Sequence, residues 1–136
     1  AKDWEDAIRC AGKLLYDTKT VTEQYVEEMV NSVKKHGPYI VVCKGMALPH
    51  ADCSKGAIEE AASLVRLKTP IEFGSVYNDP VRYVIGMSIK SAESINQAIY
   101  DMMKIFGDEN NMNKFDSLPD EQAVLDMINS FQKQKI

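Results

Sequence analysis

Two histidines are the side chains of this sequence best suited to nucleophilic chemistry, and His50 has the more informative surroundings. It follows the apolar run 46–49, which ends in Pro49. Because a proline fixes its own φ and biases the preceding residue towards an extended backbone, we expect His50 where a strand ends and a loop begins. A neutral imidazole is a good nucleophile near pH 7 when an acceptor orients its other nitrogen. The competing interpretation is a loop histidine without a chemical task.

Two other residues have both a structural and a functional interpretation. His36 ends a predicted helix before Gly37-Pro38, where a helix dipole stabilises a histidine cap. Alternatively, its imidazole lies beside His50 and assists it as a hydrogen-bond donor. Asp79 opens a predicted strand within an Asn-Asp-Pro turn. Alternatively, its carboxylate orients an imidazole or positions a loop.

Cys43 follows an apolar run, so a thiol nucleophile in a phosphate-binding loop has to be considered. Such a loop needs several glycines or hydroxyl residues that direct backbone N–H groups at the anion. Here Met46, Ala47, Leu48 and Pro49 follow a single glycine. We therefore predict that Cys43 is a buried structural thiol.

The composition is that of one ordinary globular domain over residues 1–136, with 45% apolar and 26% charged residues. A net charge of -4 argues against nucleic acid as a partner, and no apolar run approaches the roughly 20 residues that span a bilayer, so we expect no membrane insertion. Three scattered cysteines indicate reduced thiols and a cytoplasmic protein. His50 and Cys53 would need two further ligands to hold zinc, so we expect no metal and no cofactor.

Hydrophobic periodicity predicts alternating helices and strands. Asp3 is the expected cap of the first helix, and either Thr20 with Glu23 or Thr22 alone caps the second. Continuous apolar strands favour an α/β sandwich whose sheet is covered by helices on both faces. The predicted helices cover 3–16, 22–36 and 92–106, the predicted strands 39–43, 46–48, 61–67 (closed by Thr69-Pro70) and 81–89, the loop 51–60 and the turn 74–80. A helical turn over 108–115 and a helix from Ser117 are predicted to complete the chain.

The run His36-Gly-Pro-Tyr-Ile-Val-Val-Cys-Lys-Gly-Met-Ala-Leu-Pro-His50-Ala resembles the active-site segment of one protein family. This family comprises the mannitol/fructose-type enzyme IIA domains of the bacterial sugar phosphotransferase system. The His-Gly-Pro-Tyr start, with Lys68–Phe73 and Asn78–Val81, is most similar to the ascorbate-specific class. The resemblance implies an α/β sandwich with a central mixed β-sheet.

The resemblance also implies a relay function. The chain would accept a phosphoryl group from phospho-HPr on His50 and pass it to a cysteine of enzyme IIB, for uptake of L-ascorbate or a related sugar. Such a transfer needs in-line positioning rather than a nucleotide, which agrees with a sequence that has no P-loop. We expect an apolar docking rim at Met46, Leu48 and Ala51. The alternatives are a regulatory phosphohistidine-sensing domain of the same fold and a plain interaction module.

The chain departs from the family pattern in two places. Relatives carry a second histidine in the helix after the long strand, where this sequence has Ile95 and Asn96. An assisting role is therefore left open for His36 or for Asn96. Relatives also begin with a strand before the first helix, whereas this sequence begins almost at that helix, so we expect a sheet with one strand fewer.

Overall fold

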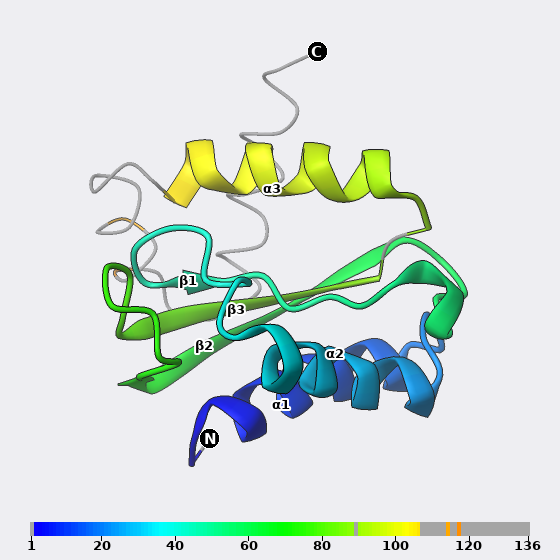
Figure 1. Cartoon of the computed structure of the whole chain (residues 1–136), viewed down its shortest axis with the longest axis horizontal. Coiled ribbons are helices and arrows are strands. Elements are labelled where there is room, and N and C mark those ends of the chain that lie inside the picture. The colour runs from blue at the N-terminus through cyan, green and yellow to red at the C-terminus, as the bar shows by residue number, and fades with distance from the viewer. Residues whose placement is uncertain (1, 89, 107–113, 115–116, 118–136) are drawn as a thin grey trace.

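The fold is a three-layer α/β sandwich, seen in a computed structural model that describes residues 2–88 and 90–106 with Lys114 and Ser117. Its elements are α1 (Trp4–Asp17), α2 (Glu23–His36), β1 (Met46–Ala47), the 3-10 turn η1 (Cys53–Lys55), β2 (Ala61–Ile71), β3 (Val81–Ser88) and α3 (Ala92–Phe106). Within the described residues β3 is the central strand, parallel to β1 and antiparallel to β2. Helices α1 and α2 cover one face of this mixed sheet and α3 covers the other, as predicted (Figure 1).

The first two helices begin and end within a residue of their predicted bounds. Asp3 caps α1 by accepting a hydrogen bond from the backbone N–H three positions on, at 2.8 Å. Thr22, and not Thr20, caps α2 in the same way at 3.3 Å. Gly37 ends α2 with a φ of 82°, a conformation that favours glycine. The segments predicted over 108–115 and after Ser117 lie almost entirely outside the described residues.

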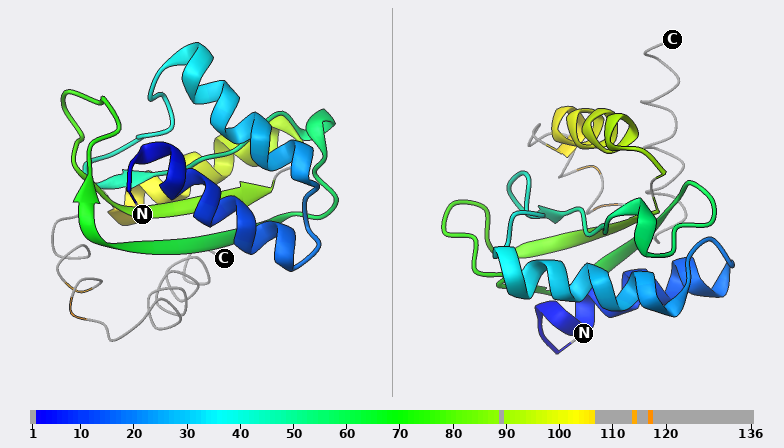
Figure 2. Two further views of the ribbon diagram at one scale, coloured as in Figure 1. Left: turned by 90° about the horizontal axis from the view of Figure 1, so that it is seen from below. Right: turned by 45° about the vertical axis from the view of Figure 1, so that its right-hand side comes forward.

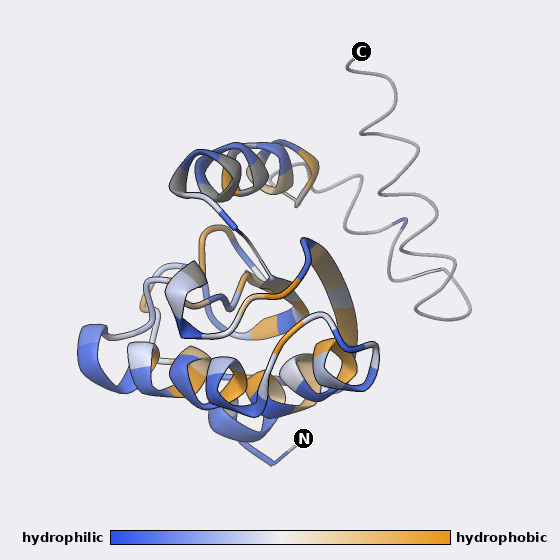
Figure 3. Ribbon diagram, turned by 90° about the vertical axis from the view of Figure 1, so that its right-hand side faces the viewer, coloured by the Kyte–Doolittle hydropathy of each residue, from blue (hydrophilic) through white to orange (hydrophobic). Residues whose placement is uncertain are grey.

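Two apolar clusters fill the spaces on either side of the sheet. β3 is buried on both faces, and its side chains alternate between the two clusters, with Val84 packed towards α1 and α2 and Tyr83 and Ile85 towards α3. Gly86 lets α1 lie close to β3, because a Cβ at this position would be only 3.0 Å from the Cβ of Ala11. Figure 2 shows α1 and α2 side by side on one face of the sheet, and Figure 3 shows apolar residues on their inner sides.

The apolar run 39–43 is not a strand of the sheet, which makes that prediction wrong. Its burial was predicted correctly only in part, since Ile40 and Val41 are in the core but Tyr39 is 44% exposed. The run instead folds back on the segment after it. The Leu48 amide donates to the Ile40 carbonyl at 2.8 Å, and Cys43 forms a bridge with Met46. This arrangement anchors the segment that leads to His50.

Two glycine turns explain why 39–43 is not a strand, and the edge position of β2 allows it to continue past its predicted end. Gly37-Pro38 starts a turn rather than a strand, and Gly45, with a φ of 80°, reverses the chain before β1. β2 continues through Pro70 to Ile71, beyond the predicted end at residue 67, with an irregular ladder between Arg66 and Ile71. A proline fits there because β2 lies at an edge of the sheet as far as the structure describes it.

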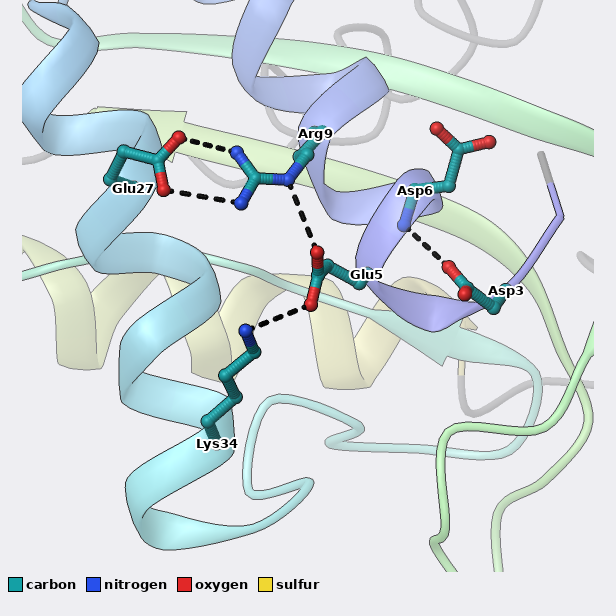
Figure 4. A network of polar contacts seen from close by, with 6 residues as sticks. All are labelled: Asp3, Glu5, Asp6, Arg9, Glu27 and Lys34. Carbon is teal, nitrogen blue, oxygen red and sulfur yellow. Dashed lines mark hydrogen bonds and ion pairs between the residues drawn. The ribbon is translucent and has the colours of Figure 1, made fainter.

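Charged side chains join α1 to α2 across their solvent side (Figure 4). Arg9 forms a two-pronged hydrogen bond with Glu27, including an Nη2–Oε2 contact of 3.1 Å. Glu5 lies between Arg9, at 3.5 Å, and Lys34, at 3.1 Å. The hydrogen bond from Arg9 lowers the pKa of Glu27. These exposed pairs help to hold the two helices in register, but each contributes little to stability.

Candidate functional site

The backbone before His50 is fixed from two directions. The Leu48 amide donates to the Ile40 carbonyl at 2.8 Å, within the fold-back described above. The Pro49 carbonyl accepts from the Met87 amide of β3 at 3.0 Å. His50 therefore lies beside the central strand β3, in the irregular segment after β1, which agrees with its predicted place at a strand end.

A buried tyrosine fixes the backbone after His50. The Tyr25 hydroxyl lies in the core beneath this segment, where it accepts from the Ala51 amide at 3.2 Å and donates to the Met87 carbonyl at 2.6 Å. Tyr25 comes from the buried face of α2. One phenol thus links helix, central strand and the residue after His50. No local sequence pattern indicates this polar contact.

The imidazole of His50 is held in one tautomer. Its Nδ1 lies 2.8 Å from the Leu48 carbonyl oxygen. Because a carbonyl oxygen can only accept, Nδ1 carries the hydrogen and Nε2 keeps a lone pair. Burial lowers the pKa of His50, and the hydrogen bond to Leu48 opposes this shift in part. The result is a neutral imidazole with a nucleophilic Nε2 at physiological pH.

Tyr39 is a site residue that sequence reasoning missed. Its ring meets the His50 ring in a T-shaped contact, with centroids 5.7 Å apart and planes at 89°. It meets the His36 ring in a second T-shaped contact, at 6.3 Å and 82°. The structure thus brings both histidines to one tyrosine, without a direct contact between the imidazoles among the described residues. The available signal was an aromatic residue directly after a helix-ending Gly-Pro.

Asp79 lies at the other end of β3 from the His50 segment. Its two carboxylate oxygens accept from the amides of Phe73 and Gly74, at 2.9 and 2.8 Å, and so close the turn between β2 and β3. His50 instead lies near the opposite end of β3, because Pro49, the residue before it, accepts a hydrogen bond from the Met87 amide. Of the alternatives weighed for Asp79, these contacts favour positioning a loop over orienting an imidazole.

The residues expected to form an apolar docking rim are in the core. Met46 and Leu48 are fully buried and Ala51 is 2% exposed, so this expectation was wrong. β1 pairs with the central strand and places its side chains in the two clusters. Tyr39, which is 44% exposed, is the large apolar side chain that borders His50.

Cys43 has the properties expected of a structural thiol. It packs against the cluster between the sheet and α3, and burial raises the pKa of its thiol to about 11. Among the described residues, no three His, Cys, Asp or Glu side chains gather in a way that could hold a metal ion. In the same part of the chain, no helix has the length and apolar character needed to cross a membrane.

The comparisons with known proteins agree with one another. Residues 1–131 match the model of the family described as phosphoenolpyruvate-dependent sugar phosphotransferase system, EIIA 2. The "Ascorbate-specific PTS system EIIA component" of Shigella boydii is 34% identical over 129 residues, covering 94% of this chain and 84% of that protein.

Solved structures give the same result. The mannitol-specific cryptic phosphotransferase enzyme IIA CmtB of Escherichia coli is 29% identical with a TM-score of 0.79, over 94% of this chain and 86% of that one. Mannitol IIA of the same organism is 25% identical with a TM-score of 0.79, over 94% and 90%. By sequence and by fold, the chain belongs to the EIIA 2 family of the phosphoenolpyruvate-dependent sugar phosphotransferase system and is one of its phosphotransferase components.

Proposed function

We propose that this chain carries a phosphoryl group on Nε2 of His50, accepted from the phosphohistidine of HPr and passed to a cysteine of enzyme IIB in the cytoplasm. The observation that carries the proposal is the Nδ1 contact with the Leu48 carbonyl, which leaves Nε2 as the nucleophile. Similarity to ascorbate-specific components supports L-ascorbate or a related sugar as the transported substrate.

The transfer balances without a cofactor. The Nε2 lone pair forms a bond to phosphorus while the bond between phosphorus and the donor nitrogen breaks, and that electron pair returns to the donor imidazole. The His50 ring gains positive charge as the new bond forms. The Leu48 carbonyl stabilises this charge through the Nδ1 hydrogen, which stays in place. Transfer to IIB repeats the exchange, with a thiolate sulfur as the attacking atom.

Reconstitution tests the proposal directly. Incubation with phosphoenolpyruvate, enzyme I and HPr should place one acid-labile, base-stable phosphate on the chain. A cognate IIB should then remove it. Restoration of sugar uptake in a strain that lacks the matching IIA separates a transport component from a regulatory domain, which would be labelled but would not restore uptake. A chain that takes up no phosphate would contradict both.

The acceptor should stay reactive in mildly acidic solution. Because burial lowers the pKa of His50 from the usual 6.5, its neutral form is the major one at pH 6.5. A proton NMR titration of its ring should give a midpoint below 6.5, and the rate of phosphorylation by phosphoramidate should fall with the same midpoint. A midpoint at or above 6.5 would show that the ring is not desolvated.

Replacement of the Cys43 thiol should leave the relay intact. The raised pKa keeps this group protonated at neutral pH, so it is a poor nucleophile. We expect Cys43→Ser to take up one phosphate per chain, like the parent, with a loss of up to about 1–3 kcal/mol from burying a hydroxyl. Phosphate bound to sulfur in the parent chain would reverse this assignment.

The donor role of His36 remains a prediction. The His36 ring contacts Tyr39, which in turn contacts His50. His36 can therefore donate a hydrogen bond to the phosphoryl oxygens only if the phosphoryl group on His50 extends towards it. Loss of one positioned donor costs roughly ten- to a thousandfold in rate. We expect His36→Gln to slow transfer from phospho-HPr by roughly that factor without changing the final amount of phosphate. An unchanged rate would leave His36 as the cap of α2.

A further inference from the structure

We propose that Tyr39 is a positioning residue for the phosphoryl acceptor, because its ring is the second fixed point that sets the plane of the His50 imidazole. The inference rests on the proposed role of His50 and assigns a task to a neighbour that sequence reasoning overlooked. It starts from the two T-shaped contacts that Tyr39 makes, at 5.7 Å with His50 and 6.3 Å with His36.

One hydrogen bond does not fix a ring. The contact between Nδ1 of His50 and the Leu48 carbonyl chooses the tautomer and anchors one atom. The torsion between Cβ and the ring is broad in histidine, so the imidazole can still swing about that anchor. The Tyr39 ring stands at 89° to the imidazole and in contact with it, where it limits this swing. Two contacts thus define the direction of the Nε2 lone pair.

Tyr39 can restrain the His50 ring because contacts with the end of α2 hold Tyr39 itself in place. Its amide donates to the Gly37 carbonyl at 2.9 Å, in the turn that follows α2. Its ring rests against His36 at the end of α2. Burial raises the pKa of its hydroxyl, and a hydrogen bond with Ser32 opposes this shift. The backbone and the ring of Tyr39 are therefore both held at the end of α2.

The direction of the lone pair matters for the reaction. In-line transfer requires Nε2, phosphorus and the leaving nitrogen to lie nearly on one line, and a misplacement of about 1 Å can cost a factor of roughly a hundred. A side chain without a ring at position 39 leaves the Leu48 hydrogen bond in place but frees the imidazole plane. We expect Tyr39→Leu to slow phosphorylation of His50 by roughly ten- to a hundredfold. With 44% of Tyr39 exposed, the fold should tolerate this change.

Two phosphoryl donors separate positioning from docking. Phospho-HPr needs a protein interface, whereas phosphoramidate reacts with the imidazole alone. Positioning predicts that Tyr39→Leu slows both reactions by a similar factor, with the loss in kcat rather than KM for phospho-HPr. Tyr39→Phe is the matched control, because it keeps the ring and removes only the hydroxyl, and it should stay within about threefold of the parent. A loss seen with phospho-HPr alone would overturn the inference and make Tyr39 a docking residue.

NMR tests the same inference without relying on transfer. In the parent chain and in Tyr39→Phe, the carbon-bound ring protons of His50 should show ring-current shifts and restricted motion. In Tyr39→Leu these shifts should disappear and the imidazole should become more mobile, while the nitrogen shifts still report hydrogen on Nδ1. A His50 ring that is equally ordered in all three chains would overturn the inference. If these NMR differences between the three chains are seen but the parent chain takes up no phosphate, the proposed function is contradicted instead.

Discussion

His50→Ala should abolish phosphate uptake from phospho-HPr, the largest effect we expect from any single substitution. The variant lacks the nitrogen that forms the bond to phosphorus, so the loss should be complete rather than a reduced rate. His50 contacts its surroundings through the Leu48 carbonyl and the Tyr39 ring, and neither contact holds the core together. The fold should therefore survive. Labelling with phosphoenolpyruvate, enzyme I and HPr measures the result.

His36→Ala is the matched control for that experiment. It removes the chain's other imidazole, from the end of α2, and should still take up one phosphate per chain. Circular dichroism and thermal unfolding should show that both variants are folded. Stoichiometric labelling of His50→Ala would show that another residue is the acceptor, and the assignment of the site would be wrong.

Tyr25→Phe should lower the stability of the fold and slow phosphorylation at the same time. The substitution removes the hydroxyl that accepts from the Ala51 amide and donates to the Met87 carbonyl. Each buried group left without its partner costs about 1–3 kcal/mol. The backbone after His50 also loses its anchor to α2, so we expect phosphorylation to slow by roughly tenfold or more.

Urea unfolding and labelling rates together test the role of Tyr25. Tyr16→Phe is a suitable control, since Tyr16 is a partly exposed tyrosine of α1 with the same hydroxyl to lose. It should match the parent in both measurements. An unfolding midpoint of Tyr25→Phe equal to that of the parent, with an unchanged slope, would show that water or a backbone shift replaces the hydroxyl at no cost.

Helices were predicted from the sequence more accurately than strands. The sequences of α1, α2 and α3 carry capping residues or a periodic pattern of apolar residues, so local rules define these helices. The run 39–43 shows the limit of those rules. Its β-branched residues fit a strand, yet the turn after Gly37 and the reversal at Gly45 fold it back on β1. Burial could be predicted from composition, but pairing depends on residues outside the run.

The site could be predicted only in part for a similar reason. The place of His50 at a strand end follows from its immediate neighbours, above all Pro49. Tyr25 and Tyr39 come to His50 through contacts between residues 11 or more positions apart, which no local pattern reveals. The docking rim was predicted wrongly because the apolar residues nearest to His50 in sequence, in β1 and in the segment after it, are buried in the core.

The three backbone contacts around His50 have a consequence for the pace of the relay. Leu48, Pro49 and Ala51 are bound to a fold-back, to the central strand and to a core tyrosine. These hydrogen bonds hold the backbone on both sides of His50, so the acceptor has little room to rearrange between accepting and passing on the phosphoryl group. In such a relay protein, no slow conformational change limits the rate of transfer. The interval between one phosphate and the next is then set by how often the partners arrive and leave, and therefore by their concentrations and by the salt around them.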